Sequence, residues 1–143
     1  MHELPSRRND TIRHKLTVFH GTAENAKRSN LYIDCWAPHD GAKAAIKEIF
    51  VDVEKTGSDE RAYVGCIFRQ TSKLLQMGCP LDEAMASLLD VKTSTSGVVV
   101  GHHKVRFSSS YMDAVAKYIL AFAEELNEKD SVTEILREGV VVV

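Results

Sequence analysis

The sequence is poor in cysteine, in net charge and in long apolar runs, and each shortage excludes a class of protein. Its three cysteines, Cys35, Cys66 and Cys79, are an odd number at wide spacings, which does not fit the disulfide framework of a small secreted protein. We expect them to be reduced, with two of them in the core. The formal net charge of only -2 does not supply the clustered positive charge that nucleic-acid binding requires, so nucleic acid is not an expected partner.

Membrane and metal signatures are also missing from the sequence. No apolar stretch approaches the roughly 20 residues of a membrane-spanning helix, and residues 1–8 contain no apolar segment typical of a signal peptide. We therefore expect a cytoplasmic protein that has no membrane partner. The spacings Cys-x-x-Cys and His-x-x-x-His do not occur, so the six histidines and three cysteines predict no metal site.

What the sequence does contain is the balance of a globular domain. Hydrophobic residues make up 44% and charged residues 27% of its 143 positions, which is typical of a chain that folds around one core. Residues 1–13 are polar, include Pro5 and show no hydrophobic period, so they predict a flexible N-terminal arm. Residues 14–143 are predicted to form a single domain.

Alternating apolar residues predict three strands in the first half of this domain. They cover residues 16–19, 31–36 and 47–53, with a polar stretch after the first strand and turn residues after the second. Apolar side chains occupy every second position of the last two strands, which places them on one face of a sheet. Three antiparallel strands connected in sequence, a meander, are the simplest arrangement.

Helical periodicity takes over in the middle of the chain. Ser58 is a suitable cap for a long helix that Gly78 ends, and Pro80 begins a second helix. Residues 92–97 are small and polar and predict a loop, which leads into a short strand within residues 98–107.

Two capping sequences predict the helices of the last third. Residues 110–113 open a helix that continues to about residue 126, and residues 131–134 open a last short helix that Gly139 ends. The fold class is therefore α+β, with an antiparallel sheet of about three to five strands packed against two or three amphipathic helices. The chain closes on four valines, residues 140–143. Because an exposed apolar tail invites strand pairing, we expect this tail to pack on its own sheet or on a second subunit, in a homodimer.

Residue types alone give few candidates for chemistry and leave the catalytic residues unknown. Cys79 precedes Pro80 at a helix start, where the helix dipole stabilises a thiolate, so it is a candidate reactive thiol; the alternative is a half-buried small residue with a structural role. Residues 94–101 are rich in Ser, Thr and Gly, as phosphate-binding loops are, but the P-loop lysine is missing and no helix follows, which favours a connecting loop. Glu48 and Asp52 fit a solvated sheet face better than acid–base chemistry.

Four segments of the chain follow the order of a known family. They are Asp40-Gly41 followed by Glu48-Ile49-Phe50-Val51-Asp52; Lys55-Thr56-Gly57-Ser58; residues 73–83, which include Gly78-Cys79-Pro80-Leu81; and Ser96-Gly97-Val98-Val99 followed by residues 109–116, which include Ser110-Tyr111-Met112-Asp113-Ala114. They resemble the strand, the Lys-x-Gly turn, the long helix ending in Gly-x-Pro-Leu and the closing Ser-x-x-Asp-Ala helix of the TSCPD-type domain. That domain lies near the C-terminus of adenosylcobalamin-dependent (class II) ribonucleotide reductases. The resemblance spans about residues 14–126.

The chain differs from the family in the five-residue motif that gives the family its name. The Thr-Ser-Cys-Pro-Asp stretch appears as Ser109-Ser110-Tyr111-Met112-Asp113, without the cysteine and the proline. A redox or metal role of that cysteine is therefore not carried over, whereas Ser110 and Asp113 keep the expected task of starting a helix.

The resemblance implies an accessory, assembly or binding domain linked to deoxyribonucleotide synthesis, and a ribonucleotide reductase large chain as its partner. Because 143 residues leave no room for the reductase barrel, we expect a stand-alone domain that is not catalytic alone. Adenosylcobalamin is implied only by the association of the family with class II reductases, and no cofactor is predicted to bind this chain. The alternative is an independent small-molecule- or nucleotide-binding protein, or a small enzyme, that reuses the fold. Its site would lie between the turn at Lys55 and Ser58 and the strand at His102 and His103.

Overall fold

The computed structural model describes residues 11–40, 43–54 and 57–137, with the backbone alone at residues 40, 58 and 130–137. Its elements, in chain order, are β1 (Thr11–Thr22), β2 (Asn25–Trp36), β3 (His39–Asp40), β4 (Lys43–Ala44), β5 (Glu48–Glu54), α1 (Ser58–Gln76), α2 (Leu81–Ala86), β6 (Gly97–His102), β7 (Val105–Ser108) and α3 (Tyr111–Arg137). Five strands form one antiparallel sheet in the order β5-β2-β1-β6-β7, and β3 pairs with β4 separately. The predicted α+β class is confirmed.

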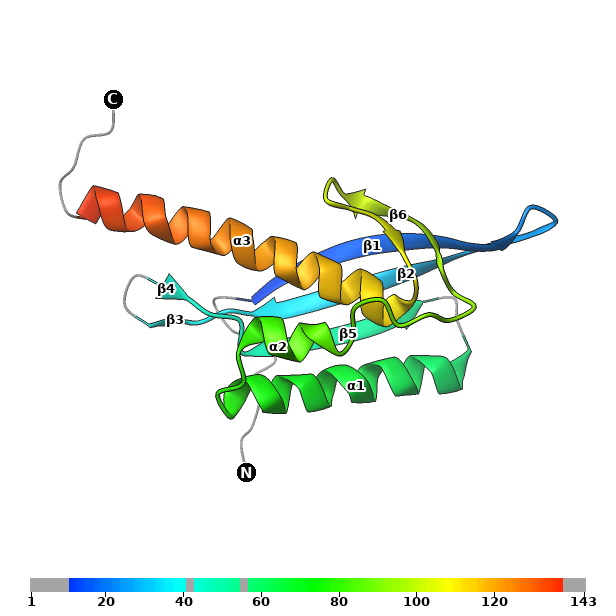
Figure 1. Cartoon of the computed structure of the whole chain (residues 1–143), viewed down its shortest axis with the longest axis horizontal. Helices are drawn as coiled ribbons and strands as arrows, with labels where there is room; N and C mark the ends of the chain where they lie inside the picture. The colour runs from blue at the N-terminus through cyan, green and yellow to red at the C-terminus, as the bar shows by residue number, and fades with distance from the viewer. Residues whose placement is uncertain (1–10, 41–42, 55–56, 138–143) are drawn as a thin grey trace.

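The core lies between one face of the sheet and the helices. In Figure 1, α3 crosses in front of the sheet and α1 runs along β5, with α2 between the two helices. The largest fully buried side chains of the sheet are Leu16, Val18, Leu31, Ile33, Ile49, Val53 and Val105, and those of the helices are Val64, Phe68, Met85, Tyr111 and Ile119. The apolar faces predicted for residues 31–35 and 49–53 are therefore the buried ones. No described helix combines the length and the apolarity needed to cross a membrane.

The first two strands are much longer than the sequence predicts. The meander of β1, β2 and β5 is confirmed, but β1 and β2 each have 12 residues and pair from Thr11↔Trp36 to Thr22↔Asn25. Residues 20–30, expected as a loop, therefore form the outer part of a hairpin. Residues 21–28, the tip of this hairpin, are exposed on both faces, so apolar alternation is absent there. Residues 11–13 belong to β1, inside the expected arm, and residues 1–10 lie outside the described residues.

The free edge of β5 is closed by a helix. The buried Ser72 hydroxyl of α1 accepts a hydrogen bond from the Ile49 N–H at 2.8 Å and lies 3.0 Å from the Ile49 carbonyl oxygen. Gln76 donates to the Lys47 carbonyl at 3.2 Å. Side chains of α1 thus take the place of a neighbouring strand, which leaves this edge less able to pair with another chain.

Two predictions for the second half of the chain were wrong in detail. The short strand expected within residues 98–107 is a hairpin of β6 and β7. The register of the β6–β7 pair shifts between Val98 and His102. Gly101 lies in that stretch with φ of +122°, a backbone conformation that glycine adopts without strain. The two helices expected after residue 110 are one helix, α3, because residues 127–130 contain no glycine or proline to interrupt it. Gly139 and the valine tail lie outside the described residues.

The start of α3 is fixed by the buried carboxylate of Asp113. It accepts hydrogen bonds from the N–H groups of Asp90 and Ser109, both at 2.8 Å, and from Lys117 Nζ at 2.8 Å. Ser110 Oγ accepts from the Asp113 N–H at 3.1 Å, as the predicted capping sequence requires. Burial alone would raise the pKa of Asp113, but these hydrogen bonds and the Lys117 charge outweigh it and lower the pKa. One side chain therefore joins the segment after α2, the end of β7 and α3.

We expect Asp113→Ala to lower the free energy of unfolding by about 2–4 kcal/mol at pH 7, because it leaves buried donors without their acceptor. The free energy of unfolding of Asp113→Asn should lie between those of Asp113→Ala and the parent protein. Since the folded pKa is lowered, the contribution is complete above the ordinary value of about 4 and is lost as the pH falls through the folded pKa. Urea unfolding followed by circular dichroism measures the effect. Asp59→Ala, an exposed first-turn residue of α1, is the control, and equal losses in both variants would contradict this role.

Candidate functional site

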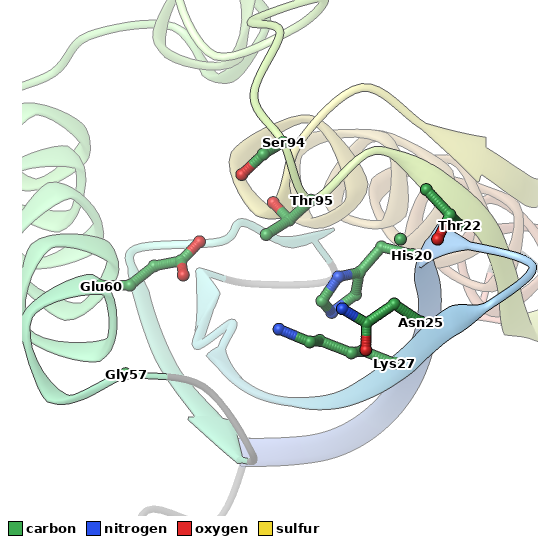
Figure 2. Close-up of a pocket in the computed structure, with 9 residues that line it drawn as sticks. His20, Thr22, Asn25, Lys27, Gly57, Glu60, Ser94 and Thr95 are labelled. Atoms are coloured by element: carbon green, nitrogen blue, oxygen red, sulfur yellow. The ribbon is translucent and has the colours of Figure 1, made fainter.

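A cavity of about 650 Å³ opens beside the outer part of the β1–β2 hairpin. We call it the hairpin pocket. Three segments supply its polar side chains: the hairpin, the start of α1 and the loop before β6. These side chains are His20, Thr22, Asn25, Lys27, Glu60, Ser94 and Thr95, with Gly21 and Gly57 completing the wall (Figure 2).

His20 is held in this wall by two buried hydroxyls. Its Nε2 lies 3.1 Å from Ser29 Oγ and 3.3 Å from Tyr111 Oη, and Tyr111 donates to Ser29 at 2.7 Å. Ser29 and Tyr111 are almost fully buried, so both hydroxyls have fixed positions. The first residue of α3 therefore helps to set the orientation of the imidazole, 91 residues away in the sequence.

The loop that forms the opposite rim is also fixed. The Thr93 and Thr95 hydroxyls lie 2.8 Å apart, and the Thr93 N–H donates to the Ser109 carbonyl at 3.0 Å. At Gly97 the chain comes so close to β1 that a Cβ atom would lie 1.8 Å from the Phe19 carbonyl oxygen. Only glycine permits this approach, which brings Thr95 over the hairpin.

Charged groups enter the pocket from opposite walls. Figure 2 shows the Lys27 side chain extending from β2 and the Glu60 side chain extending from α1 toward the same space. His20 and Lys27 are directly opposite each other in the register of β1 and β2, as are Thr22 and Asn25. Cross-strand partners project from the same face, so these four side chains form one continuous wall. The pocket therefore combines a cationic wall with a carboxylate across from it.

A second group of titratable side chains lies near the other end of β1. We call His14, His102, His103 and Tyr118 the histidine cluster. The rings of His14 and Tyr118 stack at 4.4 Å, and those of His102 and His103 at 4.6 Å. His102 Nδ1 accepts from the Lys104 N–H at 3.1 Å, so Nε2 carries the hydrogen and donates to Glu125 at 2.7 Å. His14 donates from Nε2 to the Gly101 carbonyl at 2.8 Å.

The candidate ligand residues from the sequence are only partly placed by the structure. Lys55 lies outside the described residues, and Ser58 is the first residue of α1, described by its backbone alone. His102 and His103 are in the histidine cluster, not beside the pocket. His14 of that cluster and His20 of the pocket are six positions apart on β1, which is about 20 Å of extended strand. The described residues thus do not bring the two halves of the expected site together, and a ligand role for these four residues stays a prediction.

The residues that line the pocket were missed because their segment was expected to be a loop. His20 and Lys27 become neighbours only through the long hairpin, which apolar alternation does not reveal. Ser94 and Thr95 belong to the loop that was considered for phosphate binding and set aside.

Glu48 and Asp52 lie on the partly exposed face of β5. Asp52 accepts two hydrogen bonds from Arg61 at 2.6 and 2.8 Å, and these lower the pKa of its carboxyl. Within the described part of the chain, no three His, Cys, Asp or Glu side chains are arranged to hold a metal ion.

We expect His14 to make the fold sensitive to mild acid. Burial lowers the pKa of its imidazole below the ordinary value of about 6.5. Between these two pKa values the unfolded chain binds a proton that the folded chain does not, so stability falls as the pH drops below about 6.5 and is constant above it. His14→Phe keeps the stack on Tyr118 and removes the titration. Melting temperatures at pH 8 and pH 5.5 should differ less in this variant than in the parent.

His39→Phe serves as the control for that comparison, because His39 is exposed and lies outside the histidine cluster. It should leave the drop in melting temperature between pH 8 and pH 5.5 as large as in the parent. An undiminished drop in His14→Phe would assign the acid sensitivity to another group.

The three cysteines differ in environment, which corrects the expectation that two lie in the core. Cys35 is buried, Cys79 is partly buried against the core and Cys66 is exposed on α1. Burial raises the pKa of the Cys35 thiol to about 12. The Cys79 sulfur lies 3.5 Å from the Pro80 carbonyl oxygen, just before the six-residue helix α2. Its role as a reactive thiol stays a prediction.

Alkylation of the folded chain with iodoacetamide at pH 8 should therefore discriminate the three thiols. We expect Cys66 to react readily and Cys35 to react only after unfolding, because the thiolate is the reactive form and burial suppresses it. Mass spectrometry of peptides at successive times gives the rate at each site. Cys79 reacting faster than the more exposed Cys66 would support an activated thiol, and rapid labelling of Cys35 would contradict the observed burial.

The sequence places this chain in a known family. A model of the TSCPD domain matches residues 5–123, so the chain belongs to the TSCPD domain family. It is also similar to a vitamin B12-dependent ribonucleotide reductase of Bradyrhizobium diazoefficiens, with 31% identity over 68 residues. The aligned stretch is 48% of this chain and only 5% of that enzyme, so the likeness is confined to a small part of the relative. No solved structure matches.

Proposed function

We propose that this chain is an accessory binding domain that acts with a ribonucleotide reductase large chain and does not reduce ribonucleotides by itself. The similarity to a short stretch of a vitamin B12-dependent reductase supports the choice of partner. The structural observation that carries the proposal is an apolar patch on the face of the sheet that points away from the core. We call Phe19, Val98, Val100 and Phe107 the sheet patch.

The sheet patch follows the register of three neighbouring strands. Val98 of β6 pairs with Phe19 of β1 on one side and with Phe107 of β7 on the other. These side chains are 55%, 43% and 56% exposed, whereas the adjacent Val18 and Val99 are buried beneath the helices. Val100, two positions from Val98, extends the patch on the same face.

Elsewhere on this face polar side chains pair with one another, although Phe50 of β5 is also exposed. Arg13 donates to Asp34 at 2.8 Å, and Tyr32 donates to Glu54 at 2.8 Å. The sheet patch is therefore bordered by polar side chains of β1 and β2, whereas Phe50 lies apart from it on the edge strand β5. A contiguous exposed apolar surface bordered by polar residues is typical of a protein interaction site. Because the related reductase is a far longer chain, a large protein surface is the occupant that we propose.

The cobalamin named in the relative is assigned to that enzyme and not to this chain. The hairpin pocket has the volume of a site for a small molecule, and a corrinoid with its nucleotide tail is far larger. We therefore propose that any cobalamin is held by the partner.

The test is binding between the purified chain and a purified vitamin B12-dependent reductase large chain, measured by surface plasmon resonance. We expect a saturable complex that the double variant Val98→Thr, Phe107→Thr weakens at least about tenfold, because exposed apolar contacts at an interface dominate its affinity. Threonine is well tolerated on an exposed strand, so the fold should survive.

Leu74→Gln is the matched control, since Leu74 is an exposed apolar residue of α1, away from the sheet patch. It should leave the affinity unchanged. Absence of binding, or turnover of a ribonucleotide by the chain alone, would overturn the proposal. Light scattering adds a further outcome: a dimer that the double variant converts to a monomer would assign the sheet patch to a second copy of this chain instead.

A further inference from the structure

We propose that the hairpin pocket binds a small phosphorylated molecule that also carries hydroxyl groups, such as a sugar phosphate or a nucleotide. This ligand site is separate from the sheet patch and does not depend on the partner proposed above. The cavity of about 650 Å³ falls within the range of roughly 300–1,000 Å³ that small-molecule sites occupy.

The hairpin wall has the donors that an anion requires. The register of β1 and β2 sets His20 beside Lys27 and Thr22 beside Asn25, so an ammonium, an imidazole and an amide group lie on one face. Hydrogen bonds from charged donors to phosphate oxygens are among the strongest in proteins. This wall is therefore the place for the phosphate group.

His20 is built into the site and not merely exposed at it. Within the described residues only its Nε2 has hydrogen-bonding partners, the buried hydroxyls of Ser29 and Tyr111. Nδ1 is then the ring nitrogen that can meet a ligand. The hydroxyl pair holds the ring without ligand present, which reduces the entropy lost on binding.

The opposite wall selects what the phosphate is attached to. Glu60 extends from the first turn of α1 into the same space as Lys27 (Figure 2). A carboxylate repels a phosphate and accepts hydrogen bonds from hydroxyl groups. The ligand is thus oriented with its phosphate toward the hairpin and its hydroxyls toward Glu60. Buried Thr95, on the rim between the two walls, limits the ligand's size.

The experiment compares four probes by isothermal titration calorimetry with the full chain: inorganic phosphate, ribose 5-phosphate, adenosine 5′-monophosphate and unphosphorylated adenosine. We expect ribose 5-phosphate or the nucleotide to bind at least tenfold more tightly than inorganic phosphate, and adenosine not to bind. The two phosphorylated probes distinguish a sugar phosphate from a nucleotide. No binding of either at millimolar concentration, or equal binding of adenosine and its monophosphate, would overturn the proposal.

Variants then assign the binding to the pocket. Lys27→Met removes the charge and keeps the apolar stem, and it should weaken the phosphorylated probe at least tenfold. Lys15→Met is the matched control, because Lys15 is exposed on the same hairpin but projects from the other face of the sheet. An equal loss of affinity in the two variants would show that the probe is attracted nonspecifically, and it would contradict the assignment of the site to the pocket.

Glu60→Gln tests the orientation of the ligand. It should narrow the preference for ribose 5-phosphate over inorganic phosphate, since the carboxylate both attracts hydroxyls and repels phosphate. An unchanged preference would exclude Glu60 from the site. Lys27→Met should leave binding to the reductase chain unaltered, so failure of this inference and failure of the proposed function remain distinguishable.

Discussion

The carboxylate of Asp113 is the constraint on which the arrangement of this domain depends. It accepts hydrogen bonds from the segment after α2, from the end of β7 and from Lys117 of α3, so it fixes where the longest helix begins. The same helix start carries Tyr111, whose hydroxyl reaches Ser29 and His20. In the stretch that gives the family its name, this chain keeps the serine and the aspartate and lacks the cysteine and the proline. The retained residues are those that the helix start requires, which explains how the fold persists without the thiol.

The sheet separates two kinds of surface. Its core-facing side ends in the polar hairpin pocket, whereas its outer side carries the sheet patch on β1, β6 and β7. The edge at β5 is occupied by Ser72 and Gln76 of α1, so strand addition at that edge is disfavoured. A partner is therefore expected to meet the face of the sheet. The pocket and the patch use different side chains of β1, because successive residues of a strand project to opposite faces.

The sequence was sufficient for the parts of the fold that follow apolar periodicity. The meander, the long helix α1 and the cap formed by Ser110 and Asp113 were all predicted, since each depends on residues near one another in the chain. The length of the hairpin was not predicted. Residues 20–30 pair through their backbone groups, and their side chains show no apolar alternation. The pocket was not predicted for the same reason: Lys27 and Glu60 line one cavity only after the hairpin, the start of α1 and the loop before β6 have folded together. His102 and His103 were proposed as ligand residues by type; the structure places His102 beside His14 and stacks His103 on His102, and their role as ligands stays a prediction.

The contact between Tyr111 and His20 ties the pocket wall to the first turn of a 27-residue helix. Farther along the same helix, Tyr118 stacks on His14 and Glu125 accepts a hydrogen bond from His102. One helix therefore contacts both the pocket wall and the histidine cluster, at the two ends of β1. A substitution that displaces the first turn of α3 is expected to displace the Tyr111 hydroxyl and, with it, one of the groups that orient His20.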